Sequence, residues 1–147
     1  MPLTLFLVCL ASTTFLTGLI WFVQVVHYPL FEAVPAADFE RYHAAHVRLT
    51  TRVVAAPMLL ELASSAALVV FRPTWLPAWI TWAGLAASAG CMILTATVQV
   101  PLHNRLARGF HVGAARRLIA TNWARTWLWT AHAGLLFVAL ASLAKLG

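Results

Sequence analysis

Histidine is the residue type in this chain best suited to bind a metal, and its distribution is uneven. Five of the six histidines fall in or beside two polar stretches between apolar segments: His27, His43, His46, His103 and His111. His43 and His46 stand three residues apart, so on a helix both imidazoles share one face, as a chelate requires. His27 and His103 each follow the end of an apolar segment, where a compact bundle could bring them near that pair. The pattern predicts metal ligands at His27, His43, His46 and His103.

The residue types around these histidines narrow the choice of metal. Neutral imidazole suits iron, copper or zinc. Cys9 and Cys91 lie in separate apolar segments, which disfavours an iron–sulfur cluster or a thiolate zinc site. If the histidines are ligands, we expect iron, copper or haem as the cofactor. The alternative is that they are interfacial residues, each with an apolar ring and a solvated edge.

A second candidate site lies deeper in the apolar segments. Glu61 follows Arg52 by nine residues, or about 13 Å of helix, and His132 follows Arg125 by seven, or about 10 Å. The two side chains should therefore reach similar depths, where an ionisable group is costly and a functional candidate. Glu61 and His132 are predicted as a catalytic pair that passes protons, or alternatively as a structural hydrogen bond. His46 and Glu61 would lie about 22 Å apart along a helix, so two separate sites are expected.

The elements that position these residues follow from composition. The chain has 147 residues, of which 62% are hydrophobic and 10% charged, and its mean hydropathy is +0.83. Soluble domains carry about 25% charged residues, so we expect a single integral membrane domain over residues 1–147. A membrane helix needs about 20 mostly apolar residues. Four segments qualify: 3–26, 53–71, 78–100 and 126–144. The predicted fold is an all-α bundle of four transmembrane helices.

Basic residues predict the orientation of the bundle. Eight of them fall in the first and third connections: Arg41, Arg48, Arg52, Arg105, Arg108, Arg116, Arg117 and Arg125. The positive-inside rule places both connections in the cytoplasm and both termini outside, with a bacterial inner membrane as the expected location. The basic surface of the third connection would contact phosphate groups of membrane lipids or, alternatively, an anionic amphiphilic substrate. No nucleic-acid motif accompanies it, so a nucleic-acid partner is not expected.

Two features refine the expected topology. Residues 37–48, in the first connection, have helical periodicity and predict a short helix lying along the membrane interface. A shift of 72 residues also aligns the sequence V-H-Y-P-L at 26–30 with V-Q-V-P-L at 98–102. This match predicts two pseudo-repeated helix hairpins with the same orientation, although chance similarity between apolar sequences is the alternative.

Two motifs in the second half resemble a known family. The sequence V-P-L-H-N-R-L at 100–106 and N-W-A-R-T at 122–126 are similar to motifs of the DUF1772, anthrone-oxygenase-like membrane proteins. This chain differs by having His103 where the family has Asn, and by the order of Asn122 and Trp123. The resemblance implies a four-helix bundle and, for some members, oxygenation of aromatic polyketides such as anthrones. It marks four positions for substrate binding: Asn104, Arg105, Asn122 and Arg125. Polar capping of helix ends and contact with lipid headgroups is the alternative role for these four residues.

Three classes of function fit these patterns. The first is a membrane oxidoreductase or oxygenase-like enzyme that acts on a hydrophobic small molecule at the cytoplasmic interface. In that case Arg105 and Arg125 would together hold an anionic group of the substrate. The second is a non-catalytic membrane subunit, or a protein that binds a lipid or small ligand within a larger complex. The third, a proton-coupled carrier, depends on Glu61 and would require a homo-oligomer.

Overall fold

The computed structural model describes residues 2–143 as a succession of helices. The α-helices are α1 (Pro2–Phe22), α2 (Ala36–Val70), α3 (Ala78–Leu94), α4 (Val100–Leu106) and α5 (Val112–Leu143). Two π-helical turns, Val23–His27 and Thr95–Gln99, and a 3-10 helix, Pro29–Ala33, extend α1 and α3. Ala144, the last residue of the predicted fourth span, lies outside the described residues.

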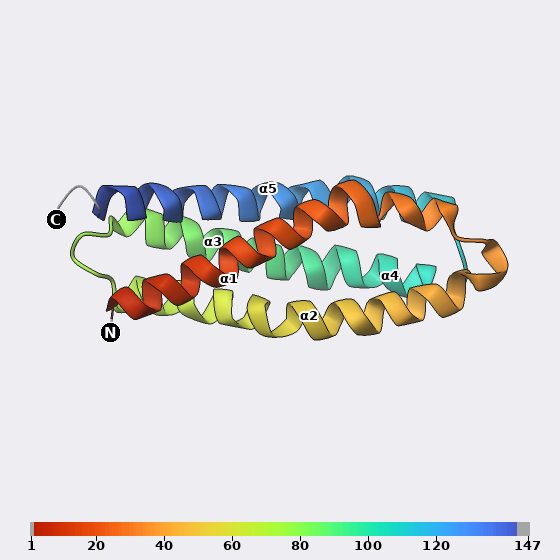
Figure 1. The fold of residues 1–147 in the computed structure, drawn as a ribbon, viewed down its shortest axis with the longest axis horizontal. Helices are drawn as coiled ribbons and strands as arrows, with labels where there is room; N and C mark the ends of the chain where they lie inside the picture. The colour runs from red at the N-terminus through yellow and green to blue at the C-terminus, as the bar shows by residue number, and fades with distance from the viewer. Residues whose placement is uncertain (1, 144–147) are drawn as a thin grey trace.

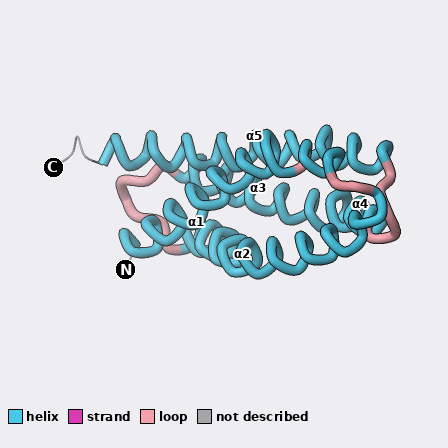
Figure 2. The backbone as a smooth tube through the Cα atoms, turned by 45° about the vertical axis from the view of Figure 1, so that its right-hand side comes forward, coloured by secondary structure: helices cyan, strands magenta, loops and turns pink. Residues whose placement is uncertain are grey.

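These elements form four long antiparallel rods (Figure 1). Each rod is long and apolar enough to cross a membrane: Pro2–Ala33, Ala36–Val70, Ala78–Leu106 and Val112–Leu143. The N-terminal end of the first rod and the C-terminal end of the last rod lie at the same end of the bundle (Figure 1). Loops connect the rods at both ends of the bundle (Figure 2). The prediction of an all-α, four-helix membrane bundle is confirmed.

The rods extend further than the hydropathy of the sequence indicates. Their 29 to 35 residues correspond to about 44–52 Å of helix, whereas the hydrocarbon core of a bilayer is about 30 Å thick. Pro101 does not end the third rod, because it occupies the first turn of α4, where a proline needs no backbone N–H partner. The bundle is therefore longer than the hydrocarbon core is thick, and most of the arginines lie at the end that holds α4.

The helix predicted over residues 37–48 is present, but it is not a separate interfacial element. It is the first part of α2, which runs without a break from Ala36 to Val70. The interval between Ala37 and Val53 contains neither proline nor glycine, so no residue interrupts the helix where the sequence changes from polar to apolar. As a result, the histidines of this segment lie on the same continuous helix as Glu61, which also contains Pro57 between them.

Two π-helical turns recur at the 72-residue offset found in the sequence. Val23–His27 and Thr95–Gln99 each end two residues before a proline, Pro29 or Pro101. In each turn a backbone N–H bonds to the carbonyl five residues earlier, as Tyr28 does with Val23 at 2.9 Å. Proline cannot donate to the preceding turn and clashes with it, which favours such a local widening. The repeated V-x-x-P-L step therefore coincides with a repeated local structure.

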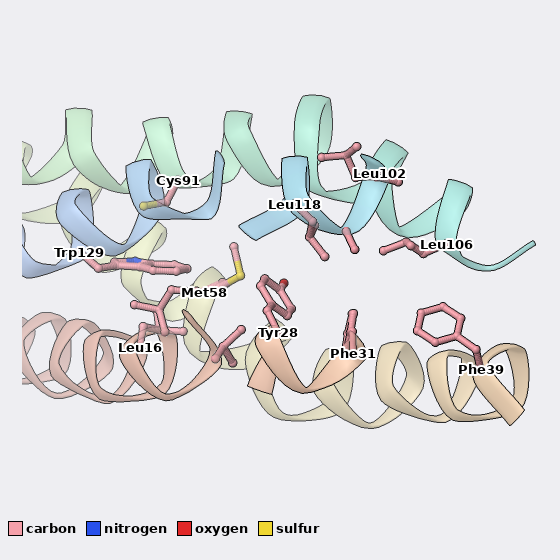
Figure 3. Packing of buried hydrophobic residues seen from close by; sticks show 14 residues of the cluster. Leu16, Tyr28, Phe31, Phe39, Met58, Cys91, Leu102, Leu106, Leu118 and Trp129 are labelled. Carbon is pink, nitrogen blue, oxygen red and sulfur yellow. The ribbon is translucent and has the colours of Figure 1, made fainter. Parts of the chain in front are cut away.

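Aromatic side chains fill the interior near the α4 end of the bundle. Tyr28, Phe31 and Phe39 are all buried, and they project from the first two rods toward leucines of the other two (Figure 3). Leu102, Leu106 and Leu118 belong to the same buried cluster. This packing holds the ends of the rods together around the histidines.

Candidate functional site

Four histidines from three of the rods meet at the α4 end of the bundle; we call them the histidine cluster, and they are His27, His43, His46 and His103. His27 Nε2 lies 2.6 Å from His46 Nδ1, and His43 Nε2 lies 3.0 Å from His103 Nδ1. The two pairs are adjacent, since the rings of His46 and His103 are 5.4 Å apart. The four residues predicted as metal ligands therefore lie together, and metal binding by them remains a prediction.

Neighbouring side chains orient these imidazoles. The Tyr28 hydroxyl lies 3.2 Å from His103 Nε2, and the Thr50 hydroxyl lies 3.2 Å from His46 Nδ1. The ring of Phe31 packs edge-on against His46 at 5.1 Å. His43 is fully buried, and its Nδ1 has no hydrogen-bond partner among the described residues. An orphaned buried nitrogen of this kind is a free donor or acceptor within the cluster.

The arrangement fits a metal ion only after a small rearrangement. As the side chains lie, no three His, Cys, Asp or Glu residues within the described chain are arranged to hold a metal. Two imidazoles on one tetrahedral ion, at 2.0–2.1 Å each, would hold their nitrogens about 3.3 Å apart. The two histidine pairs are closer than this, at 2.6 and 3.0 Å. To admit an ion, the nitrogens of the His27–His46 pair would have to separate by about 0.7 Å and those of the His43–His103 pair by about 0.3 Å, and the rings would have to turn toward the ion. An all-imidazole donor set suits iron, copper or zinc.

His111 does not join the cluster. It precedes α5 and is exposed, next to Arg105 and Arg108 in a shallow surface hollow. Arg116 and Arg117 are also exposed, on the first turns of α5. This basic surface is therefore separate from the histidine cluster.

The deep pair, Glu61 and His132, is formed as a direct contact. His132 Nδ1 lies 3.0 Å from Glu61 Oε1, and both side chains are buried. The indole of Trp129 donates from Nε1 to the other carboxylate oxygen of Glu61 at 2.9 Å. Small neighbours make room for the imidazole: a methyl group added to Gly84 would lie 2.6 Å from His132 Nε2. Both oxygens of the Glu61 side chain are thus hydrogen-bonded, as a buried polar group in a membrane requires.

The residues marked by the family resemblance separate into two groups. Asn122 and Arg125 are buried and joined, with Arg125 Nη1 donating to Asn122 Oδ1 at 3.1 Å. Asn122 Nδ2 in turn donates to Gln24 Oε1 at 2.8 Å. Asn104 and Arg105 are exposed on α4, but Asn104 also lines the internal cavity that Arg125 lines, whereas Arg105 does not. The expectation that Arg105 and Arg125 hold one anion together is wrong, because Arg105 lines the surface hollow and Arg125 an internal cavity.

That internal cavity, which we call the central cavity, has a volume of about 170 Å³ and lies between the two predicted sites. His46, His103 and Tyr28 line one part of it, and Arg125 and Trp129 line another. The remaining wall is mostly apolar and includes Leu16, Ile20, Val23, Val54 and Met58. A ligand in this cavity would contact the histidine cluster directly. It would reach Glu61 only through Trp129, which donates to that carboxylate.

The sequence analysis did not select Tyr28, Trp129 or Gln24 as functional residues. A signal for Trp129 was present, because it stands four residues after Arg125 and three before His132, which is the spacing of one helix face. Gln24 gave no comparable signal, since an isolated glutamine in an apolar segment has no defined partner in the sequence.

Comparison with known proteins identified no relative of this chain. The chain matches no protein-family model, no curated protein and no solved structure.

Proposed function

We propose that this chain is a membrane-embedded, oxidoreductase or oxygenase-like enzyme acting on a hydrophobic small molecule. The observation that carries the proposal is the gathering of four imidazoles beside an apolar cavity within a four-helix membrane bundle. His27, His43, His46 and His103 would hold an iron or copper ion, which would supply the redox chemistry that protein side chains lack. The resemblance of residues 100–106 and 122–126 to the anthrone-oxygenase-like family supports the same class of reaction.

A metal ion fits this site better than haem. The central cavity has a volume of about 170 Å³, whereas pockets for drug-sized molecules occupy about 300–1,000 Å³. A haem macrocycle would therefore require the rods to separate, whereas an ion requires only that the imidazoles of the two pairs move apart by about 0.3–0.7 Å and turn toward it.

The protein side chains would bind and orient the substrate. The apolar wall would take up the hydrophobic body and exclude water, and Tyr28 and Thr50 would fix the imidazole orientations. Glu61 and His132 are not among the residues that line the cavity, so we assign them a positioning role. Their hydrogen bonds hold Trp129, and Trp129 forms part of the cavity wall.

The arginines around the site indicate how the bundle would be oriented in a membrane. Arginines flank the histidine end of the bundle, so the positive-inside rule would place this end at the cytoplasmic interface and both termini outside. A bacterial inner membrane is the location we propose.

Metal analysis of the full-length protein, purified in detergent, tests the proposal. We expect bound iron or copper in the wild type and at least a tenfold loss of metal in the His43→Ala, His46→Ala double variant. His111→Ala is the matched control, because His111 is exposed outside the cluster, and it should retain the metal. A wild type that takes up neither iron nor copper, or a double variant with unchanged metal content, would refute the metal site.

One observation favours a second candidate, a non-catalytic subunit or small-ligand binder. The histidines form two pairs at hydrogen-bonding distance, and these pairwise contacts need no ion. If this second candidate is correct, the protein should bind a hydrophobic ligand in the central cavity. It should contain no metal after purification and should take up none during incubation with iron or copper.

A further inference from the structure

We infer that the central cavity selects a molecule that carries a carboxylate on an apolar body, and that Arg125 is the residue that binds the carboxylate. This inference takes the central cavity as the substrate site and so rests on the proposed function, whose substrate class it narrows. The observations that support this inference do not involve the metal, because they concern Arg125 and the residues that line the central cavity around it.

Arg125 is a buried cation with no acidic partner. Its side chain is only 7% exposed, and the residue lines the central cavity. Among the described residues it forms no salt bridge, since the acid of this region, Glu61, pairs with His132. Its Nε–H is buried and has no hydrogen-bond partner in the described part of the chain. Burial at this level also rules out the alternative role of contacting lipid headgroups.

The contacts that Arg125 does make hold the guanidinium in place without neutralising it. Nη1 donates to Asn122 Oδ1 at 3.1 Å, and Asn122 is itself fixed by Gln24. The guanidinium carbon lies 4.9 Å from the ring centre of Trp129, which gives a cation–π contact. These partners are neutral, and a buried charge without a counter-ion is strongly unfavourable. The site is therefore preorganised for an anion, and a carboxylate matches the planar, forked donors of arginine.

The cavity also limits the body of the ligand. Its volume is about 170 Å³, close to the ~150 Å³ of a cavity that takes up benzene. Val47 of α2 and Val100 of α4 both line it and are also 37% and 46% exposed, so the cavity opens to the surface between these helices. An aromatic acid would fit inside, and a fatty acid would place its carboxylate at Arg125 while its chain leaves through this opening.

Binding measurements on full-length protein in lipid nanodiscs test this inference. Radiolabelled benzoate and laurate represent the two sources of carboxylate, and benzamide and dodecanol are their neutral counterparts. In the wild type we expect at least one acid to bind about tenfold or more tightly than its neutral counterpart, as a charge-assisted contact requires. Arg125→Met should abolish this preference, and Arg125→Lys should restore part of it. Arg105→Met is the matched control, because it removes an exposed cation on α4 and should leave the preference unchanged.

The outcomes separate this inference from the proposed function. Acid binding that survives in the His43→Ala, His46→Ala variant but not in Arg125→Met assigns the carboxylate to Arg125, whether or not a metal is present. Acid binding that is lost in the histidine variant and kept in Arg125→Met would overturn the inference and place the anion on the metal. Equal affinity of the wild type for acids and neutral counterparts would also overturn it, and this result needs no variant to fold.

Discussion

Replacing Gly84 with alanine should displace His132 and break the deep pair. Gly84 is buried on α3, and an added methyl carbon would lie 2.6, 3.0 and 3.4 Å from three atoms of the His132 ring. The ring cannot turn away freely, because its side chain is 1% exposed and its Nδ1 is bonded to Glu61. The substitution therefore forces either a shift of the helices or loss of the bond to Glu61.

Two opposing effects determine the change in unfolding free energy of Gly84→Ala. Overpacking a closely packed interior costs about 1–3 kcal/mol, whereas replacing glycine by alanine within a helix gains roughly 1 kcal/mol. The net loss of unfolding free energy for Gly84→Ala should be about 0–2 kcal/mol. Gly18→Ala is the matched control, because no atom lies within 4 Å of the methyl group it would add. It receives the helix gain alone, so Gly84→Ala should be about 1–3 kcal/mol less stable than this control.

A double-mutant cycle attributes the loss to the contact with His132. Unfolding free energies would be measured in detergent for the wild type, Gly84→Ala, His132→Ala and the double variant. In the His132→Ala background the clash is absent, so adding the methyl group at Gly84 should cost nothing, and the two substitutions should be strongly non-additive. Equal stability of Gly84→Ala and Gly18→Ala, or additive effects in the cycle, would refute the placement of His132 against α3.

Three further predictions concern the two sites. Glu61→Gln should lower the unfolding free energy, measured in detergent, by about 1–3 kcal/mol. The reason is that the carboxyl group bonds both Trp129 and His132, whereas an amide has only one oxygen to accept their N–H groups. Glu32→Gln, at an exposed acid, should have no measurable effect in the same assay. Val47→Trp should weaken ligand binding in nanodiscs by about tenfold, which corresponds to about 1.4 kcal/mol of obstruction at the cavity opening. Val53→Trp should leave ligand binding unchanged, because Val53 is exposed on α2 but does not line the cavity. Metal content should fall when the protein is equilibrated at acidic pH and recover on neutralisation, because protons compete with the metal for imidazole nitrogens; metal content that does not vary with pH would argue against histidine ligands.

The fold could be predicted from the sequence because lipid contact imposes a simple rule on it. The four apolar segments gave the number of rods correctly, since each backbone crossing a bilayer must form its own hydrogen bonds in a helix. The ends of the rods could not be predicted in the same way. Residues 37–52 and 112–125 are polar enough to be loops by hydropathy, yet they continue α2 and α5. Outside the hydrocarbon, a helix persists until a residue stops it, and hydropathy does not report that.

The candidate site was partly predictable for a related reason. The spacing of His43 and His46 placed both on one helix face, and both are buried on α2. The approach of His103 depends on the third rod continuing past Pro101, whereas the predicted third span ended at residue 100. Arg125 was selected through the resemblance, but its isolation from Arg105 follows from the bundle, because Arg105 is exposed on α4 and Arg125 faces inward from α5.

The structure also connects the central cavity with the deep pair, Glu61 and His132, which the sequence analysis treated as a separate site. Asn122, Arg125, Trp129 and His132 are spaced by three or four residues, so they form one buried face of α5. Arg125 and Trp129 line the central cavity, and Trp129 donates to Glu61 while His132 bonds the same carboxylate. The deep pair therefore fixes the indole against which the guanidinium of Arg125 packs. A polar pair near the middle of the bundle can in this way determine the geometry of an anion site that it does not touch.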